Sequence, residues 1–570
     1  MTPNGNEMTQ ELLQRAERAG IATEYTGFWG HAVQVPPAVL QRALDAMGPH
    51  HDAEQCSCVV VRAGEAQTIP LLTAGAWQLR DADRADAPPV AEGHGDAATW
   101  TPDLPAGYYR LHCGQQAIWV FAGPAQCWLP EGLQQGERWW GITAQMYGLR
   151  SERSWGIGDF SDLMQCVHLA AAQGAAFVGV SPLHALRADQ PDAASPYSPA
   201  SRLALNVLHI DVTAIPEYLQ CGRTQALCQS PDFLARLEAV RQSATVDYPA
   251  VAALKQAALT QLWQTFRETA WSGDGGRGRA FDAFCTVHAD TLGCHARYEA
   301  IQAVMRAEDA AIWGWPAWPE ALQDVRSAAV DAFTKEHAEA VAYRLWLQWV
   351  AHEQLQRVGE RARALMPIGL YCDLAVGAAD GGTDTWAQPA LYARGMNVGA
   401  PPDPLSAQGQ DWGLPPVNPV ALADAGFRPF RQLLETTMGP AGALRMDHVM
   451  ALMRLFWTSP EGGTYVRYPL EVLLAVLAIE SHRHRCMVIG EDLGNVVPRM
   501  REAMASHALL SYKPLIFERV DQGGFRPPGQ WPARALAVVS THDLPTLSGF
   551  WGGDDVAVQH ALGWLDTDAH

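Results

Sequence analysis

Two patterns of hydrophobic and polar positions alternate along most of the chain. Short apolar runs with the length of buried strands are separated by stretches in which apolar residues recur three and four apart, as in amphipathic helices. The strand-like runs are residues 141–147, 176–181, 368–373, 443–447, 486–491, 515–517 and 536–541. Such alternation favours parallel strands joined by crossover helices. We therefore predict a (β/α)8 TIM-type barrel that is one strand short in this sequence.

The chain before the barrel has a different pattern. Residues 7–20 and 37–47 have the apolar spacing of helices. The runs that follow are short, rich in Val, Tyr and Trp, and separated by Gly, Pro and Asp, which favours a small antiparallel, β-sandwich-like region. We therefore expect an N-terminal helical segment at residues 1–55, a β domain at 56–135 and the catalytic barrel at 136–570.

One long interruption separates the second and third predicted barrel strands. Residues 185–340 contain helical patterns and an aromatic loop, so we expect a helical insertion there. Residues 336–365 predict one long helix. Its Val341, Leu345 and Trp349 are spaced by four positions and should lie on one face, which we expect to pack on the barrel.

Composition and charge narrow the classes of function. Hydrophobic residues make up 48% of the 570 positions and charged residues 18%, which indicates a globular protein with a large core. The 41 basic and 61 acidic residues give a net charge of -20, which disfavours nucleic acid and anionic membranes as partners. No signal-peptide pattern or membrane-spanning run is present, so we expect a cytoplasmic protein. The sequence leaves its oligomeric state open.

The cysteines do not indicate a metal or a disulfide framework. All eleven are scattered, and no Cys-x-x-Cys pair occurs. An odd number of cysteines, several within strand-like runs, favours reduced structural thiols. We therefore expect no metal site.

Acidic residues end four of the predicted strands. Asp373, Asp447, Glu491 and Asp543 fall at or just after the C-terminal ends of these strands. Barrel enzymes hold their catalytic residues at that end. Each carboxylate taken singly could instead be a helix cap or a solvated loop acid, and barrels also host metal-dependent and other chemistry.

Glycosidic chemistry suits this set of carboxylates. Cleavage with retention needs one carboxylate that attacks the anomeric carbon and one carboxylic acid that protonates the leaving oxygen. Arg445 stands two residues before Asp447, so it should share a strand face with that carboxylate and keep it ionised. Glu491 would need a raised pKa to act as the acid.

Several motifs resemble those of one known family. The residues are Met146 to Phe160, Ser195-Pro-Tyr-Ser-Pro199, Val398 to Asp403, Asp411-Trp-Gly-Leu-Pro415, Arg445-Met-Asp447-His448, Gly490-Glu491-Asp-Leu-Gly494 and Thr541-His542-Asp543. They are similar to the motifs of the amylomaltase, or 4-α-glucanotransferase, family (glycoside hydrolase family 77), in its longer form with an extra N-terminal domain.

The resemblance implies roles for individual residues. The implied catalytic residues are Asp447 as nucleophile, Glu491 as acid/base and Asp543 as stabiliser of the distorted sugar. The implied substrate-binding residues are Tyr197, as a stacking floor for that sugar, with Asp373, Trp412, Arg445 and His542. For Tyr197 and Trp412 the alternative is core packing, the commoner fate of large aromatic residues.

The resemblance also implies an activity. The expected reaction is transfer of an α-1,4-glucan segment to the 4-hydroxyl of another glucan or glucose, with maltooligosaccharides as substrates and no cofactor. The alternatives are an α-glucan hydrolase and a truncated, inactive glucan-binding protein. Family members continue through an eighth strand, whereas this sequence ends at His570, soon after Asp543. If these residues are the whole polypeptide, we expect an open barrel seam, with the positions of the catalytic acids affected.

Overall fold

A central parallel sheet organises the molecule. The computed structural model describes residues 5–48, 58–84, 86–100, 104–271, 275–403, 406–520 and 523–563. Within these ranges seven strands form the sheet in the order β20-β19-β18-β15-β12-β9-β8, and every neighbouring pair is parallel. The strands are β8 (Gly141–Ala144), β9 (Phe177–Val180), β12 (Gly369–Leu374), β15 (Ala443–Met446), β18 (Met487–Gly490), β19 (Leu510–Pro514) and β20 (Ala535–Val538). The sheet curls as in a TIM-type barrel, with β8 and β20 as its outer described strands.

Burial explains why most of these strands were predicted. Every residue of β9, β12, β15 and β18 is buried, so each strand is an almost continuous apolar run. The prediction of a strand at 515–517 was wrong, because those residues form a 3-10 turn. The strand is β19, in which half-buried Ser511 and Lys513 alternate with buried residues and hide the apolar signal. It ends at Pro514, which cannot donate a ladder hydrogen bond.

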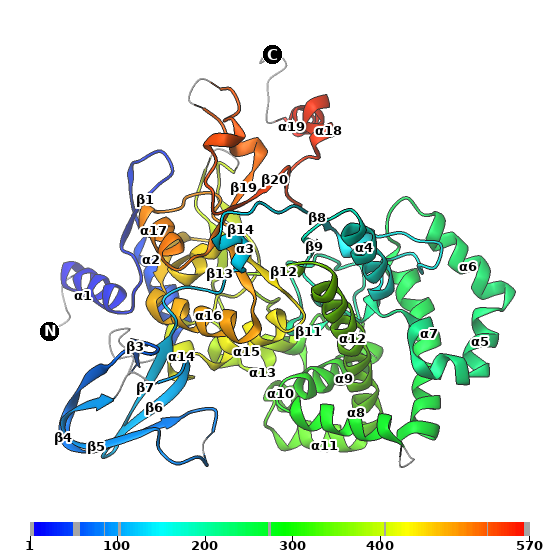
Figure 1. Cartoon of the computed structure of the whole chain (residues 1–570), viewed down its shortest axis with the longest axis horizontal. Coiled ribbons are helices and arrows are strands. Elements are labelled where there is room, and N and C mark those ends of the chain that lie inside the picture. The colour runs from blue at the N-terminus through cyan, green and yellow to red at the C-terminus, as the bar shows by residue number, and fades with distance from the viewer. Residues whose placement is uncertain are drawn as a thin grey trace.

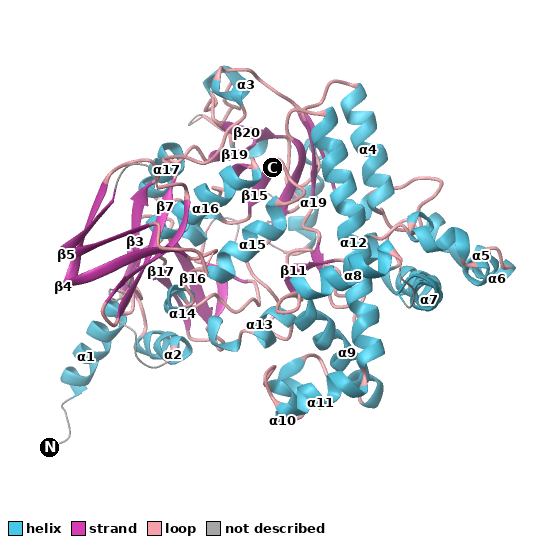
Figure 2. Ribbon diagram, turned by 60° about the horizontal axis from the view of Figure 1, so that its bottom comes forward, coloured by secondary structure: helices cyan, strands magenta, loops and turns pink. Residues whose placement is uncertain are grey.

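Helices follow or flank the strands of this sheet, and several of them pack on its outside. Those that follow or flank its strands are α4 (Phe160–Ala172), α12 (Ala338–Leu365), α13 (Thr383–Ala387), α14 (Pro419–Asp424), α15 (Arg428–Met438), α16 (Leu470–His484), α17 (Pro498–Ser506), α18 (Leu547–Gly552) and α19 (Asp554–Ala561). Figure 2 shows α12 beside α4 and α15 beside α16. These crossovers place the C-terminal ends of successive strands along one edge of the sheet.

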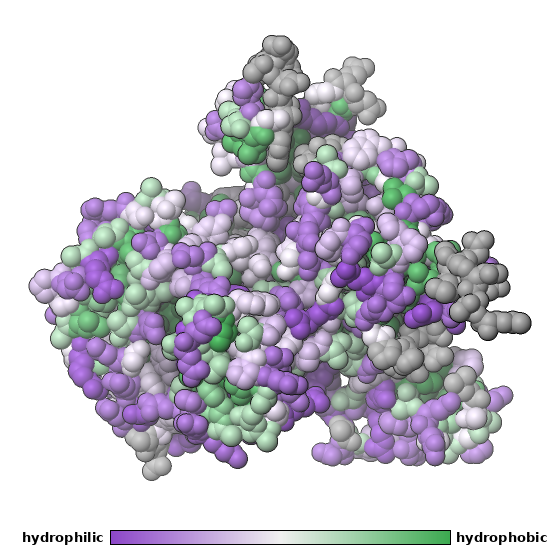
Figure 3. All heavy atoms as spheres, turned by 180° about the vertical axis from the view of Figure 1, so that it is seen from behind, coloured by the Kyte–Doolittle hydropathy of each residue, from purple (hydrophilic) through white to green (hydrophobic). Residues whose placement is uncertain are grey.

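The segment between β9 and β12 forms a mainly helical lobe. It contains a short pair of strands, β10 (His184–Ala185) and β11 (Ser201–Leu205), and the helices α5 (Gly222–Cys228), α6 (Pro231–Gln242), α7 (Tyr248–Phe266), α8 (Gly276–Val287), α9 (Leu292–Glu308), α10 (Glu320–Gln323) and α11 (Ala328–Glu336). Figure 1 shows this lobe in green on the right of the molecule. It lies away from the N-terminal sheet, and Figure 3 shows a notch between the two on the lower edge.

The apolar stripe of α12 faces this lobe instead of the barrel. Val341 packs on α9, where Leu345 also makes contact. The ring of Trp349 lies 5.6 Å from Phe266 and 5.4 Å from Phe281, between centroids. The predicted direction of the stripe was therefore wrong. Because α12 is covered by the lobe on one side and by α4 and β12 on the other, it has apolar residues all round and its stripe does not identify the barrel side.

A second insertion follows the barrel strands β12 and β15. It is a four-stranded antiparallel sheet in the order β14-β13-β16-β17. Its strands are β13 (Asn397–Ala400), β14 (Gln410–Asp411), β16 (Arg454–Ser459) and β17 (Gly462–Arg467). The sequence analysis did not predict this sheet, because its strands are short and rich in polar residues and glycine. It stands beside the site described below.

The N-terminal part contributes helices, a hairpin and a sheet. Its elements are α1 (Gly5–Arg18), β1 (Glu24–Thr26), β2 (Ala32–Gln34), α2 (Pro37–Met47), β3 (Cys58–Arg62), β4 (Gln67–Asp81), β5 (Ala91–Trp100), β6 (Gly107–Cys113), β7 (Gln116–Gly123) and, after the sheet, α3 (Glu131–Gln134). The sheet order is β3-β7-β6-β4-β5. Its β3–β7 pair is parallel, so the sheet is mixed, whereas an antiparallel one was expected.

A buried carboxylate joins the N-terminal sheet to the barrel. The Tyr108 hydroxyl, from β6, donates a 2.6 Å hydrogen bond to Glu480 of α16, whose side chain is fully buried. Arg431 and Arg483 both lie over the Tyr108 ring, 4.3 and 4.8 Å from its centroid. An uncompensated buried carboxylate is costly, so this cluster should hold the two parts together.

We expect Tyr108→Phe to destabilise the protein without impairing catalysis. The change leaves Glu480 without its hydroxyl donor and should cost about 1–3 kcal/mol. Urea denaturation with intrinsic fluorescence measures the shift in midpoint. Tyr109→Phe is the matched control, because the Tyr109 hydroxyl donates only to the Pro105 carbonyl. An equal midpoint for the two variants would contradict a special role for the Tyr108–Glu480 contact.

On the face in Figure 3, hydrophilic residues predominate and hydrophobic residues are interspersed among them. No helix within the described ranges has both the length and the apolar character needed to cross a membrane.

Candidate active site

A cavity of about 620 Å³ opens where the barrel strands end. Seven of the eight residues singled out from the sequence line it: Tyr197, Trp412, Arg445, Asp447, Glu491, His542 and Asp543. The eighth, Asp373, lies behind this wall and is bonded to Arg445 and Tyr197. The structure therefore brings the whole predicted set into one place.

Strand register sets the positions of the two central carboxylates. Met446 and Gly490 are paired at the ends of the neighbouring parallel strands β15 and β18, and Asp447 and Glu491 follow them directly. The Glu491 amide donates to the Met446 carbonyl at 3.0 Å, which continues the ladder by one step. Adjacent strands lie about 4.8 Å apart, so the two carboxylates project from equivalent and neighbouring points of the backbone.

The turn after Asp447 holds Glu491. His448 has a left-handed backbone (φ 49°), and its N–H donates to Glu491 Oε2 at 2.9 Å. The Leu493 N–H donates to Glu491 Oε1 at 2.7 Å. Both carboxylate oxygens are thus fixed by backbone donors. A backbone contact of this kind leaves no side-chain signature in the sequence.

Arg445 connects the carboxylates at the base of the cavity. Its Nη1 lies 2.8 Å from Asp373 Oδ1 and 2.9 Å from Asp447 Oδ1. Asp373 and Arg445 are cross-strand partners in the β12–β15 register, which explains their contact. The Tyr197 hydroxyl completes the group by donating to Asp373 Oδ2 at 2.6 Å. Each member is therefore held by at least one charged or strongly polar partner.

Burial controls the protonation of Asp447. Its side chain is 19% exposed, and burial raises its pKa to about 7. Arg445 lowers this pKa, whereas the negative charges of Asp373 and Glu491 raise it. The expectation that Arg445 keeps Asp447 ionised is therefore only partly right. Arg445 divides its charge between two carboxylates, and the net shift is upward.

The pKa of Glu491 is also raised. Burial is the main cause, and it is opposed by Arg445 and by the N–H groups of Leu493 and His448. The direction agrees with the raised pKa that an acid at this position needs. The neighbouring charge of Asp447 favours a state in which only one of the two carboxyl groups is ionised.

The remaining predicted residues form the opposite part of the wall. The rings of Tyr197 and His542 stack, with centroids 4.0 Å apart and planes 10° from parallel. One face of Tyr197 is therefore covered by His542, and a sugar can stack only on the other face. His542 Nε2 lies 3.1 Å from Asp543 Oδ2, and the Asp543 side chain is 77% exposed. Burial lowers the pKa of His542, while Asp543 acts in the opposite direction.

Trp412 is half-buried at the rim of the cavity, so it is not a core residue. Its ring meets His448 edge to face at 5.3 Å, and its Nε1 donates to Gln410. The wall also includes residues that the sequence analysis did not select, namely Phe28, Met450, Phe456, Tyr465, Asn495 and Phe517. They come from distant parts of the chain. The sequence offered one indication of them, because Phe28 and Trp29 are adjacent aromatic residues between Gly27 and Gly30.

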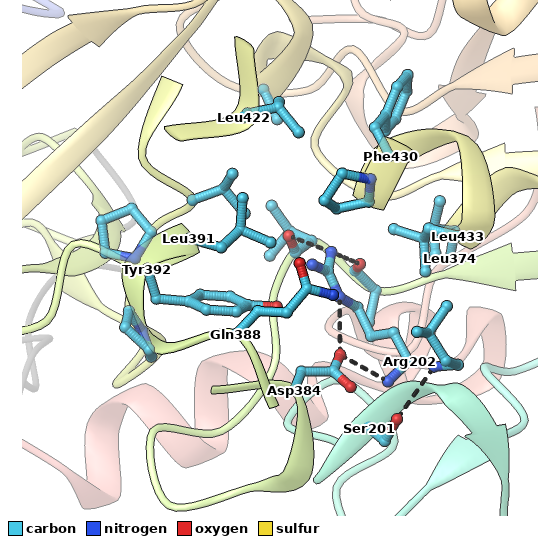
Figure 4. A pocket seen from close by; sticks show the side chains of 18 of the residues that line it. Ser201, Arg202, Leu374, Asp384, Gln388, Leu391, Tyr392, Leu422, Phe430 and Leu433 are labelled. Atoms are coloured by element: carbon cyan, nitrogen blue, oxygen red, sulfur yellow. Dashed lines mark hydrogen bonds and ion pairs between the residues drawn. The ribbon is translucent and has the colours of Figure 1, made fainter. Parts of the chain in front are cut away.

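A second cavity, of about 130 Å³, has Asp447 in its wall. Apolar side chains, among them several leucines and Phe430, form most of its wall, and Figure 4 shows Arg202 and Asp384 facing each other on the polar side. Arg202 Nη1 donates to the carbonyls of Ala375 and Val376, at 3.3 and 3.0 Å. This contact fixes the turn that follows Asp373, so Arg202 supports the site from behind.

Within the described residues, no three His, Cys, Asp or Glu side chains are grouped so that they could hold a metal ion. The acidic groups of the cavity are instead bonded to Arg445, to His542 and to backbone N–H groups.

Comparisons with known proteins agree on one family. The family model described as 4-alpha-glucanotransferase, glycoside hydrolase family 77, matches residues 144–568. A 4-alpha-glucanotransferase of Haemophilus influenzae is 34% identical over 593 residues, which cover 99% of this chain and 83% of that protein. A 4-alpha-glucanotransferase of Mycobacterium tuberculosis is 36% identical over 618 residues, which cover 98% of this chain and 83% of that protein.

Solved structures give the same picture of the fold. The crystal structure of amylomaltase from Corynebacterium glutamicum superposes with a TM-score of 0.80 at 29% identity, covering 99% of this chain and 83% of that one. An amylomaltase from Streptococcus agalactiae in complex with acarbose has a TM-score of 0.62 at 19% identity, covering 76% of this chain and 86% of that one. The second likeness concerns the fold alone.

Proposed function

The chain belongs to the 4-α-glucanotransferase family, glycoside hydrolase family 77, and we propose that it transfers α-1,4-glucan segments by double displacement on Asp447. The donors are maltooligosaccharides or longer α-1,4-glucans, and the acceptor is the 4-hydroxyl of another glucan or of glucose. Asp447 is the nucleophile and Glu491 is the acid/base. No cofactor takes part.

The observation that carries this proposal is the β15–β18 register. It sets Asp447 and Glu491 one residue beyond a cross-strand pair, on strands about 4.8 Å apart. Retaining enzymes hold their two carboxyl groups about 5–5.5 Å apart, whereas inverting enzymes need a wider gap for water. The register favours the first arrangement.

The first half of the reaction forms a covalent intermediate. An Asp447 carboxylate oxygen attacks C1 of the donor sugar as the bond from C1 to the leaving oxygen breaks. Glu491 gives its proton to that oxygen, and the released glucan leaves with a free 4-hydroxyl. The raised pKa of Glu491 favours the protonated form that this step uses.

The second half transfers the sugar. The 4-hydroxyl of the acceptor attacks C1, the ester bond to Asp447 breaks, and Glu491 takes the hydroxyl proton. The backbone donors of His448 and Leu493 favour the ionised Glu491 needed as base in this half. Burial therefore favours the protonated form of Glu491, which the first half uses. The backbone hydrogen bonds favour the ionised form, which the second half uses.

The other residues bind the sugar at the cleavage point. Asp543 faces the cavity with an exposed carboxylate, which can accept hydrogen bonds from sugar hydroxyls as positive charge develops on the ring. The free face of Tyr197 offers an apolar floor, and its hydroxyl is held by Asp373. Trp412 contributes to the groove at the rim.

Product analysis tests the proposal. Incubation with maltotriose should give glucose together with a ladder of longer maltooligosaccharides, resolved by chromatography or mass spectrometry. Release of glucose and maltose without longer products would indicate hydrolysis. Absence of any turnover in a folded preparation would contradict both activities.

The acidic limb of the pH profile should report Asp447. Because the nucleophile must be ionised, kcat/KM should fall as the pH drops below about 7, the pKa of Asp447. Asp373→Asn removes a negative charge that raises this pKa, so its acidic limb should move to lower pH by about one unit, even though its activity falls.

Tyr197→Phe is the matched control for the charge effect. It removes the hydroxyl bonded to Asp373 but leaves every charge in place. Its activity should fall while its acidic limb stays where it is in the wild type. If the acidic limb of the pH profile moved equally in Asp373→Asn and Tyr197→Phe, its position would not depend on the charges around Asp447.

We also propose the cytoplasm as the location. Eleven scattered cysteines, some of them buried in or next to barrel strands such as Cys372 and Cys486, suit a reducing compartment.

A further inference from the structure

A small hairpin from the N-terminal part reaches the catalytic cavity. Strands β1 and β2 are joined by a tight turn from Gly27 to His31. The Gly27 N–H donates to the His31 carbonyl at 2.9 Å, and the Gly30 N–H donates to the Gly27 carbonyl at 3.0 Å. Gly30 has a φ of +81°, which favours glycine. Figure 1 shows this dark-blue hairpin projecting toward the top of the molecule, as does the chain after β19.

The base of the hairpin is fixed to the sheet that borders the site. The Tyr25 ring meets Phe456 and Tyr465 edge to face, at 5.5 and 5.6 Å. The Ala22 N–H donates to the Tyr465 carbonyl at 2.8 Å, and the Arg467 N–H donates to the Gly20 carbonyl at 2.9 Å. The N-terminal chain thus extends β17, and the hairpin has a defined place beside the cavity.

The tip of the hairpin leaves two large aromatic rings in solvent. Phe28 is 47% exposed and Trp29 is 58% exposed. Phe28 also lines the cavity that holds Asp447 and Glu491. The two rings meet edge to face at 5.8 Å, and Trp29 stacks on His31 with planes 10° from parallel. These contacts fix the orientation of the rings without burying them.

Single exposed hydrophobic residues need no explanation, but this pair differs from them. Its two rings are adjacent, oriented by contacts, and set at the rim of the cavity that holds Asp447 and Glu491, by a turn in which the positive φ of Gly30 favours glycine. Exposed apolar surface that is rimmed by polar groups marks binding sites. The partly exposed Phe517 lines the same cavity.

The position of the pair indicates its ligand. A chain that fills the cavity around Asp447 and continues outward on the hairpin side passes Phe28 before it reaches Trp29. A sugar ring has apolar C–H faces that stack on aromatic rings and hydroxyl edges that stay in water. A flat, half-exposed indole at the rim suits such a ligand, because it provides contact area with little loss of conformational freedom.

We propose that Phe28 and Trp29 form an aromatic subsite at which a long α-1,4-glucan is held beyond the units inside the catalytic cavity. The proposal rests on the function given above and assigns the N-terminal hairpin a role in it. It implies that Trp29 favours long substrates, while short ones such as maltotriose do not extend to it.

The test compares a short and a long substrate. Trp29→Ala should raise KM for an amylose fraction of about twenty units by about three- to tenfold, the range expected for loss of one aromatic stacking contact. Its kcat with amylose, and both constants with maltotriose, should stay within twofold of the wild type. Trp29→Phe keeps a ring and should retain most of the affinity for amylose.

Trp140→Ala is the matched control, because Trp140 is also 50% exposed but precedes β8, at the opposite end of the barrel strands. It should leave every constant unchanged. An unchanged KM for amylose in Trp29→Ala would overturn the proposal, and so would an equal loss with maltotriose and amylose. A dimer that Trp29→Ala dissociates, with no change in KM, would assign the rings to a second copy of the chain and also overturn it. Failure of the wild type to elongate maltotriose would instead contradict the transferase function.

Discussion

Replacement of Asp447 by Asn is expected to lower the transferase rate by at least about 10⁴-fold, because the amide cannot form the covalent intermediate. The fold should survive, since Asn has nearly the same shape and Arg445 keeps its contacts with Asp373. Initial rates of maltotriose disproportionation measure the loss. Circular dichroism and the thermal midpoint check the fold.

Asp232→Asn is the control for the chemical change itself. Asp232 lies on α6 in an exposed pair with Arg236, away from the cavity. That variant should keep full activity. If folded Asp447→Asn retained more than about a tenth of the wild-type rate, Asp447 would not be the nucleophile.

Glu491→Gln is expected to separate the two halves of catalysis. Natural glucans need protonation of the leaving oxygen, so their turnover should fall by about 10²–10⁴-fold. A glycosyl fluoride needs little protonation, so its attack by Asp447 should change by less than about tenfold. The burst of fluoride release in the first turnover measures the attack by Asp447, and the rate of maltotriose disproportionation measures the complete reaction.

Glu491→Gln has a matched control. Glu238→Gln changes an exposed residue of α6 that bonds only to Gln242 among its described contacts, and it should leave both rates unchanged. Equal losses with glycosyl fluoride and maltotriose would mean that Glu491 acts on the attack of Asp447. They would contradict its role as acid.

The sequence allowed the barrel and its acidic residues to be predicted for a physical reason. Buried parallel strands are apolar along their whole length, and catalytic carboxylates interrupt that pattern at the strand ends. Asp447 and Glu491 stood out in this way. β19 did not, because half-buried Ser511 and Lys513 alternate with its buried residues.

Contacts between distant parts of the chain could not be predicted in the same way. The stack of Tyr197 on His542 and the sharing of Arg445 between Asp373 and Asp447 depend on register and on loop paths. The net upward shift in the pKa of Asp447 follows from burial, which no local pattern reveals.

The hairpin illustrates the same limit. Its glycines and aromatic residues predict a turn with an exposed tip, but nothing local places that tip beside Asp447. The placement depends on the pairing of residues near Gly20 with β17, several hundred positions later in the chain. Motif resemblance indicated the proposed catalytic residues, whereas the proposed role of the N-terminal hairpin follows from the three-dimensional arrangement.

Trapping of the intermediate tests the central claim most directly. Glu491→Gln lacks the base for the second half of the reaction, so treatment with an α-maltotriosyl fluoride should accumulate the glycosyl-enzyme. Peptide mass spectrometry after rapid quenching should find one added maltotriosyl mass on the peptide that contains Asp447. The account predicts this mass at Asp447 and its loss in Asp447→Asn/Glu491→Gln. No added mass, or attachment at another carboxylate such as Asp543, would contradict it.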